Sequence, residues 1–532
     1  MSAEIRPSYS PAKTFAWLAV IFAAVAGLSL ISIHLPLGRD QGVAAYFGWQ
    51  VLNGKAVYRE LYHFNFPGIF LTYALAFKTL GLSVEAVNAF DLVFRIFTLA
   101  GVFLAGRRLF GTRSALWAAG IYGLTTTVVY NNYWLNAQKE TFALGALVFC
   151  LYFFAMGMAG SELRKKWLFL AGVCAAWAML YKPTVALAPG LASLFLLLHK
   201  EFKLKDRGLG FASFTAGAIF LSGAVLAWLA SAHSLPEMAR QVFIFGSNYG
   251  GQYYTGGWKV LGLAVWKLLR WAIDFGFLAG FGLLGAALLA RSKDRGFKLV
   301  FWFGLGLFLN LMVQLKFFVY HFMVLALPLS LFAGAFFGEQ LSELLPSRPR
   351  TAKTAVLILA AFLFASNLRA DFGRYGRELL YDFGMISRED FLERYGRWGA
   401  GDISALASSK VARYLREQTG GNDKVLVFGL EPGLNFLSRR PSPTRFCYDL
   451  PLVYQSGGDR FKNYQAGIRK EFLDELGAGP PAYIVVIEKD TNTVEPGDSF
   501  GQMLEFVEFR DFIGQNYYLE TKIEHYYLYR RK

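Results

Sequence analysis

The sequence predicts a polytopic α-helical membrane protein that ends in a soluble α/β domain. Of its 532 residues, 55% are hydrophobic and 17% are aromatic, and the mean hydropathy is +0.35. Long apolar stretches recur as far as about residue 368, and beyond them the pattern becomes that of a globular domain. We therefore expect a membrane domain over residues 1–369 and a soluble domain over residues 370–532.

The net charge of +16 is unevenly distributed along the chain. Residues 1–369 carry 32 Lys and Arg against 14 Asp and Glu, whereas residues 370–532 carry 22 against 24. The basic surplus therefore lies in the loops of the membrane domain, where it bears on topology. It does not indicate a nucleic-acid-binding surface.

The first span begins the membrane domain. The apolar run from Phe15 to Ile33 has about the length that a helix needs to cross a bilayer core of about 30 Å. Arg6 and Lys13 precede it, as in a signal peptide, but the run exceeds a signal h-region and more spans follow, so we expect an uncleaved helix. We predict about eleven spans in all: 14–34, 88–106, 114–131, 140–159, 167–181, 184–199, 209–231, 272–290, 297–315, 320–338 and 352–368.

The loops between these spans predict the orientation. Compact basic clusters lie at 107–113, 164–166, 200–207, 291–298 and 348–353, and such clusters mark the cytoplasmic side. The N-terminus is then cytoplasmic. The first loop (35–87), the turn at 131–139, the polar stretch 231–258 and the C-terminal domain share the extracytoplasmic face.

The C-terminal domain has the alternation of helices and strands that is typical of an α/β fold. We predict helices at Ser404–Gln418 and Phe461–Leu476, and buried strands at Lys424–Phe428 and Ala482–Ile487. A turn at Gly429–Gly433 leads to a short helix, and Tyr517–Tyr529 reads as β structure. The GLEPG turn lacks the features of a phosphate-binding loop.

The segment Leu35–Gly68 is the main candidate for chemistry, because here the apolar chain first becomes polar. Asp40 lies just beyond the first span, flanked by Arg39 and Gln41. The segment that follows, up to the Pro-Gly turn, includes Tyr58, His63 and Asn65, which are further candidates for binding substrate. A carboxylate at this position could accept a proton from a hydroxyl or amine.

Other ionisable residues are predicted at the same membrane face. Glu140 begins the fourth span, Lys182 precedes Pro183, and the pair Tyr320 and His321 lies near that end of its own span. We predict that Asp40, Glu140, Lys182 and His321 surround one pocket, in which cations would stabilise charge on a departing phosphate. Individually, each could instead be a snorkelling or capping side chain.

A second set of charges has a simpler interpretation. Asp91 and Arg95 are four residues apart in the second span and are expected to pair with each other. No metal-ligand set is evident, because the acidic residues are scattered and the histidines are isolated.

The order of these motifs resembles a known family. RDQGVAAYFGWQVLNGKAVYRE, a PG turn, NAQKETFALG, YKPT and VYHFMVLALPL follow the first span in the order found in GT-C glycosyltransferases. The resemblance, over roughly residues 15–340, is to the group of protein O-mannosyltransferases and aminoarabinose or galacturonic acid lipid A transferases. It implies a multi-span bundle, a catalytic acid in the first extracytoplasmic loop and a polyprenyl-phosphate-sugar donor.

The resemblance also implies roles for individual residues. Asp40 matches the acidic residue of the first loop, the general base or acceptor-orienting group, Glu140 matches a second acidic position, and Tyr58 matches a tyrosine of the same loop. Many members have Asp-Glu where this chain has Asp40-Gln41, and Lys-Pro-Pro where it has Asn65-Phe66-Pro67. The second departure removes a phosphate-binding lysine, so Lys182 or Arg39 would have to replace it.

We therefore expect a lipid-linked glycosyltransferase of the bacterial inner membrane that needs no cofactor, is surrounded by membrane lipids and acts on an unidentified extracytoplasmic acceptor, which could be a lipid, a glycan or a protein. Inversion at the anomeric carbon is implied by the family resemblance. A transporter or flippase for a lipid-linked glycan is the alternative. It would require acidic and basic residues at mid-membrane and an internal repeat, whereas the candidate residues lie at one membrane face and no repeat is visible by eye. A non-catalytic scaffold would leave the polar first loop unexplained.

Overall fold

The computed structural model describes residues 10–129, 133–251, 257–291, 294–344, 350–398, 402–455, 458–491 and 497–532. The predicted turn at 131–139 and polar stretch 231–258, and the basic clusters 291–298 and 348–353, each lie partly outside these residues. The chain divides into two compact units. The first comprises residues 1–33, 88–226 and 253–376, and the second comprises residues 34–87, 227–252 and 377–532.

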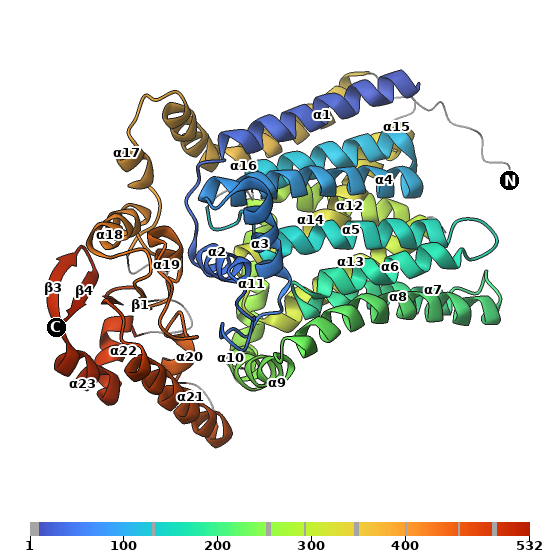
Figure 1. Ribbon diagram of the computed structural model, residues 1–532. Helices are drawn as coiled ribbons and strands as arrows, with labels where there is room; N and C mark the ends of the chain where they lie inside the picture. The colour runs from blue at the N-terminus through green and yellow to red at the C-terminus, as the bar shows by residue number, and fades with distance from the viewer. Residues whose placement is uncertain are drawn as a thin grey trace. The chain divides into compact units, whose positions relative to one another are not determined.

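The first unit is a bundle of apolar helices, which Figure 1 shows running side by side. Its elements are α1 (Pro11–Ile31), α4 (Val84–Leu124), η1 (Thr125–Val129), α5 (Lys139–Gly157), α6 (Lys165–Met179), η2 (Pro183–Ala186), α7 (Leu187–Leu198), α8 (Leu204–Ser231), α11 (Trp258–Asp274), α12 (Gly276–Ala290), α13 (Arg295–Gln314), η5 (Val319–Leu325), α14 (Ala326–Ala335), η6 (Phe336–Gln340), α15 (Leu341–Leu344) and α16 (Arg350–Asp382). The ends of α4, α8 and α16 extend into the second unit.

This bundle makes the chain a multi-pass membrane protein. Within the described residues, six helices are long and apolar enough to cross a bilayer, or seven if the bent pair α11 and α12 counts as one span. The count is lower than the eleven predicted spans because several segments are short or broken. Helix α4, for instance, runs through two predicted spans and breaks at Gly111, where φ is +86°.

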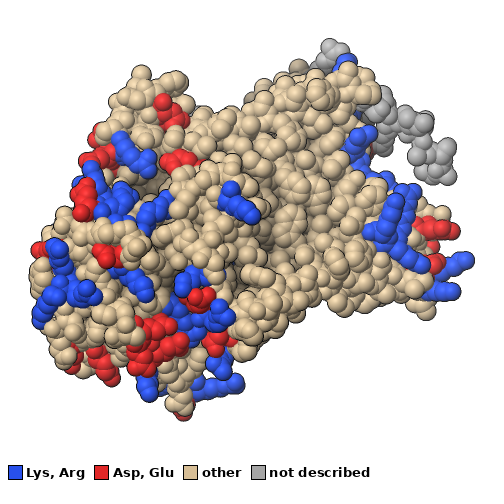
Figure 2. Space-filling model, viewed as in Figure 1, with Lys and Arg blue, Asp and Glu red and all other residues tan. Residues whose placement is uncertain are grey.

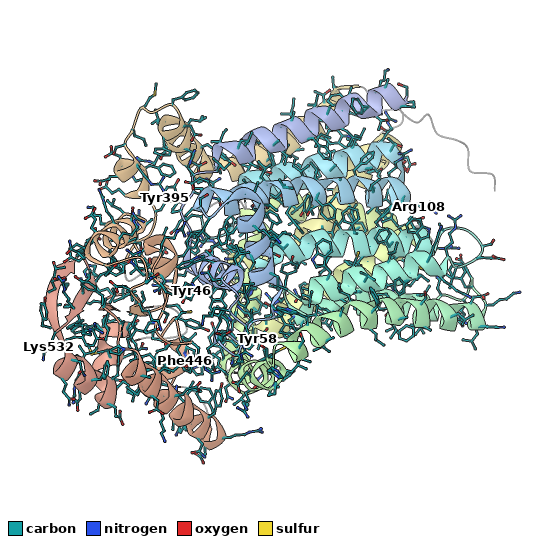
Figure 3. The ribbon with its side chains drawn as sticks, in the orientation of Figure 1. Tyr46, Tyr58, Arg108, Tyr395, Phe446 and Lys532 are labelled. Carbon is teal, nitrogen blue, oxygen red and sulfur yellow. The ribbon has the colours of Figure 1, made fainter. Side chains whose placement is uncertain are left out.

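The charged side chains of the bundle lie mainly at the helix ends, as the basic clusters between the apolar segments indicate. Figure 2 shows a broad face of this unit without charged side chains and a group of basic side chains at one end of the helices. Arg108, labelled in Figure 3, lies at that end, next to the break in α4.

The second unit combines three separate parts of the chain. The first-loop part contains α2 (Arg39–Leu52) and α3 (Gly68–Leu80), and the middle part contains α9 (Leu235–Arg240), η3 (Gln241–Phe245) and α10 (Gly246–Gly251). The C-terminal part contributes α17 (Arg388–Leu392), α18 (Ala405–Gln418), β1 (Val425–Phe428), α19 (Gly433–Ser438), α20 (Leu450–Val453), α21 (Asp459–Ala478), β2 (Tyr483–Ile487), α22 (Ser499–Glu505), α23 (Val507–Asn516), β3 (Tyr517–Ile523) and β4 (Tyr526–Arg531).

A four-stranded sheet organises the C-terminal part, in the order β1-β2-β4-β3. Strands β1 and β2 are parallel, with Val425 opposite Tyr483, and β4 runs antiparallel to both β2 and β3. The strands β1 and β2 are buried along their whole length, which fits a sheet that is covered on both faces.

Each face of the sheet has its own hydrophobic core. Leu426 and Val486 pack with residues of α21, α22 and α23 on one face, and Val427 and Val485 pack with α18 on the other. The first core also includes Tyr62 of the first loop, which is fully buried. The first loop is therefore part of the folded core of this unit.

The helices and strands predicted for this part form at their expected places. Helix α18 begins after Ser404, whose side chain accepts a hydrogen bond from the N–H of Ala407. Helix α3 was not predicted, because its 13 residues are too few for a span.

Candidate functional site

The sequence-predicted site residues fall in both units. Glu140, Lys182, Tyr320 and His321 belong to the first unit, and Arg39, Asp40, Gln41, Tyr58, His63 and Asn65 belong to the second. Each group is described by itself.

Glu140, Lys182 and His321 come together in the first unit. Glu140 lies in the first turn of α5, Lys182 lies where Pro183 begins η2 after α6, and His321 lies in η5. Lys182 Nζ donates to Glu140 Oε1 at 2.5 Å, and His321 Nε2 lies 3.9 Å from the same oxygen. We call these three residues the Glu140 cluster.

Burial makes the Glu140 cluster a costly arrangement. The Glu140 side chain is 1% exposed and that of Lys182 is 14% exposed, so each charge depends on the other for compensation. The N-terminus of α5 adds a favourable dipole for the carboxylate. Among the described residues, Glu140 Oε2 and His321 Nδ1 are buried without a hydrogen-bond partner, which is unusual for polar atoms inside a protein.

The neighbouring residues fix the shape of this cluster. The rings of Tyr320 and His321 are perpendicular, with centroids 4.7 Å apart. Thr141 donates to the sulfur of Met323 at 3.7 Å, which joins the start of α5 to η5. Both contacts restrict how His321 can turn toward Glu140.

The Asp91–Arg95 pair also forms, and it does more than the sequence predicted. Arg95 Nε donates to Asp91 Oδ2 at 2.6 Å, and Nη2 donates to Asn136 Oδ1 at 3.0 Å. Asp91 Oδ1 accepts from the N–H of Ala137 at 3.0 Å, where φ is +49°. The pair therefore holds the strained turn that leads into Glu140.

Asp40 occupies the first turn of α2 in the second unit. Gly38 caps the helix with extended backbone angles, and the chain turns into the helix at Arg39. The Asp40 side chain is exposed, whereas Gln41 beside it is 3% exposed. A carboxylate here is stabilised by the helix dipole and is exposed at the surface of this unit.

Arg39 points in a different direction from Asp40. Its Nη2 donates to the backbone carbonyl of Asp490 at 2.9 Å, in the C-terminal part of the same unit. Its Nε and Nη1 atoms are buried. Arg39 also lines a cavity together with Asp402, Ser408 and Glu431.

Tyr58, His63 and Asn65 form a closed turn. The Tyr58 hydroxyl donates to the Asn65 carbonyl at 2.8 Å, and the Asn65 N–H donates to His63 Nδ1 at 2.9 Å. Tyr58 is fully buried with φ at +70°, and burial raises the pKa of its phenol. His63 is 4% exposed and packs between aromatic rings. In this structure the three residues shape the loop.

Two residues that sequence reasoning missed hold this turn. Gln241 is fully buried, accepts from the His63 N–H at 2.9 Å and donates to the Tyr58 carbonyl at 2.8 Å. Arg445 donates to the Tyr58 carbonyl at 3.4 Å, and its own carbonyl accepts from the Tyr62 N–H at 2.9 Å. The sequence could have indicated Gln241, because it is a polar residue directly before the apolar run of η3. No local pattern singles out Arg445.

Among the residues that the structure describes, no three His, Cys, Asp or Glu side chains converge as ligands would.

Comparisons with known proteins agree with the resemblance seen in the sequence. Residues 66–228 match the family model described as dolichyl-phosphate-mannose-protein mannosyltransferase. A search of curated protein sequences found no match.

Solved structures of similar fold extend over nearly the whole chain. The apo crystal structure of ArnT from Cupriavidus metallidurans has 16% identity and a TM-score of 0.59, covering 97% of this chain and 98% of that one. ArnT bound to undecaprenyl phosphate gives 15% identity, a TM-score of 0.58 and the same coverage. AglB from Archaeoglobus fulgidus, in complex with an inhibitory peptide and a dolichol-phosphate, gives 12% identity and a TM-score of 0.48, covering 98% of this chain and 75% of that one. The chain has the fold of ArnT, as the predicted resemblance to GT-C glycosyltransferases implied.

Proposed function

We propose that the protein transfers a sugar from a polyprenyl-phosphate-linked donor to an extracytoplasmic acceptor, with inversion at the anomeric carbon. The observation that carries the proposal is the similarity to the ArnT fold over 97% of this chain. In this chain, the exposed Asp40 lies in the first turn of α2, the first helix of the loop. One of the two ArnT structures holds undecaprenyl phosphate, a lipid of the class that we assign to the donor.

Asp40 is our candidate for the general base. In the proposed step, an acceptor hydroxyl or amine attacks the anomeric carbon, the bond from that carbon to the phosphate oxygen breaks, and Asp40 takes the acceptor proton. The polyprenyl phosphate leaves with the electron pair of the broken bond. The exposure of Asp40 and its place at a helix N-terminus suit a carboxylate that must be charged and reachable.

Lys182 is our candidate for the cation that stabilises the departing phosphate. In the absence of donor its ammonium pairs with Glu140, which keeps a buried charge compensated. A phosphate could share or replace this partner, and His321 could add a hydrogen bond. Arg39 is a weaker candidate, since its guanidinium turns toward Asp490.

The remaining residues of the first loop have supporting roles in this proposal. Tyr58, His63 and Asn65 keep the loop in one shape, since their polar atoms bond to one another and to Gln241. Gln41, next to Asp40, would help to orient the acceptor. The acceptor itself is unidentified.

We also propose a topology. The chain would cross the bacterial inner membrane about eleven times, with a cytoplasmic N-terminus. The catalytic first loop (35–87) and an α/β domain (370–532) would lie on the periplasmic side. The basic side chains at one end of the helices support this orientation. In the second unit, the first loop and the C-terminal part share a hydrophobic core, as expected of segments on one side of a membrane.

The test is an assay of purified protein with polyprenyl-phosphate sugars and cell-envelope acceptors. Sugar on the acceptor together with free polyprenyl phosphate would support the proposal. Movement of intact donor across a vesicle membrane without cleavage would favour a flippase instead. Full transfer by an Asp40→Asn variant would rule out the general-base role.

A further inference from the structure

The C-terminal part of the second unit contains a crevice at one edge of its sheet. Strands β1 and β2 are neighbours and parallel, so their C-terminal ends open at the same edge. In open α/β sheets this edge is where ligands bind. Glu431 follows β1 and Asp490 follows β2, and they are 8% and 3% exposed.

Acidic groups accumulate at this edge. Asp449 is 3% exposed and lines a small cavity with Asp490, Leu430 and Ser499. Asp402 and Glu431 line the larger cavity described above. We call Asp402, Glu431, Asp449 and Asp490 the acidic crevice.

Arg39 places a positive charge beside the acidic crevice. Burial raises the pKa of all four carboxyl groups, and the charge of Arg39 opposes the rise at each of them. Arg39 is also in direct contact, because its Nη2 donates to the Asp490 carbonyl at 2.9 Å. The guanidinium of the first loop therefore occupies the place of a cationic ligand.

The rest of α2 is docked on the same C-terminal part. A Cβ atom on Gly42 would lie 2.9 Å from the Cα of Gly433, so the backbones of α2 and α19 touch there. One turn further, the Tyr46 hydroxyl accepts from the N–H of Ser442 at 2.9 Å. Arg39, Gly42 and Tyr46 follow helical spacing along one face of α2, whereas Asp40, on another face, is exposed.

We propose that Arg39 is a built-in ligand of the acidic crevice, and that by filling it Arg39 fixes helix α2 and positions Asp40. Arg39 is a positioning residue in this account. The docking of α2 stands on the contacts alone, and only its consequence for Asp40 rests on the proposed function.

Hydrogen exchange on the full-length protein in detergent, with an Arg39→Gly variant, tests the docking. Loss of a charge-assisted contact should speed amide exchange in α2 by about tenfold to a hundredfold. Methylguanidinium in the millimolar range should restore slow exchange by refilling the crevice, and sodium chloride at equal ionic strength should not. An Arg39→Lys variant, which keeps the charge without the planar fork, should exchange at an intermediate rate.

Arg388→Gly is the matched control. Arg388 lines the same cavity, but its side chain is 53% exposed, so its loss should leave α2 exchange unchanged. The docking proposal would be refuted if the amides of α2 exchanged at the same rate in Arg39→Gly as in the parent protein. It would also be refuted if methylguanidinium and sodium chloride had equal effects on that rate. The intermediate Arg39→Lys variant gives the same test if Arg39→Gly fails to fold.

The catalytic consequence has a separate readout. Sugar transfer should fall in Arg39→Gly and recover with methylguanidinium in parallel with the exchange rate. If exchange responds but the parent protein transfers no sugar, the docking stands and the proposed function fails. If transfer is unchanged while α2 exchange is fast, Arg39 does not position Asp40.

Discussion

Replacing Glu431 by Gln should weaken the dependence of stability on pH. Burial raises the pKa of Glu431 from its ordinary value of 4.5 to about 7, although Ser408 and Tyr526 donate hydrogen bonds to it. The folded protein therefore holds this proton up to about pH 7, and the unfolded chain loses it near pH 4.5. The resulting stabilisation is complete below about pH 4.5 and is lost as the pH rises through about 7.

The size of the effect follows from these two values. At 1.36 kcal/mol per pKa unit, the difference between 4.5 and about 7 is on the order of 3 kcal/mol. Gln has no proton to lose, so the parent should lose about this much more stability than Glu431→Gln between pH 4.5 and pH 8. The apparent melting temperature of the parent should fall by roughly 6–12 °C more.

Labelling of Cys447 provides the assay. Cys447 is fully buried in the C-terminal part, so its labelling reports unfolding of this part once Cys150 and Cys174 are replaced by Ala. The labelling rate is normalised to that of the unfolded protein at each pH. Glu417→Gln, which removes an exposed carboxylate of α18, is the control. A parent and a Glu431→Gln variant with the same pH profile would refute the reasoning.

Two further substitutions test contacts within the units, one in each unit. Lys182→Met should destabilise the protein by about 3–5 kcal/mol, because Glu140 is 1% exposed and loses its partner. Adding Glu140→Gln should restore the melting temperature without restoring sugar transfer, and a double variant as unstable as Lys182→Met would refute the pairing. Gly42→Ala should destabilise the protein by about 1–3 kcal/mol in thermal unfolding, because its Cβ would lie 2.9 Å from the Cα of Gly433. Gly190→Ala, with nothing within 4 Å of its Cβ, should be neutral or slightly stabilising, and equal effects of the two would contradict the close crossing.

Local patterns were enough to predict most elements of the fold. The buried runs of β1 and β2 and the periodic α18 and α21 lie where hydrophobic spacing places them. Helix α3 was missed because an apolar run of 13 residues fits neither a span nor an amphipathic surface helix. The number of spans was the least predictable feature, because short and broken helices give no clear hydropathy peak of full span length.

The candidate site was predictable where topology alone brings residues together. Glu140, Lys182 and His321 were expected at one end of their helices, and the structure places them in contact or close to it. The partner of Arg39 was not predictable, because its contact to Asp490 joins residues that lie 451 positions apart. Tyr58 was expected among the candidate site residues of the first loop, but it is fully buried, and Gln241, which donates to its carbonyl, is connected to it by no local pattern.

The most direct test is the rate of sugar transfer by Asp40→Asn, measured in single turnover with a polyprenyl-phosphate sugar. Asp459→Asn is a close control, since Asp459 is also an exposed aspartate in the first turn of a helix capped by an extended glycine. The account predicts a rate about 100-fold to 10,000-fold lower for Asp40→Asn and a parental rate for the control. Equal rates for Asp40→Asn and the parent would contradict it.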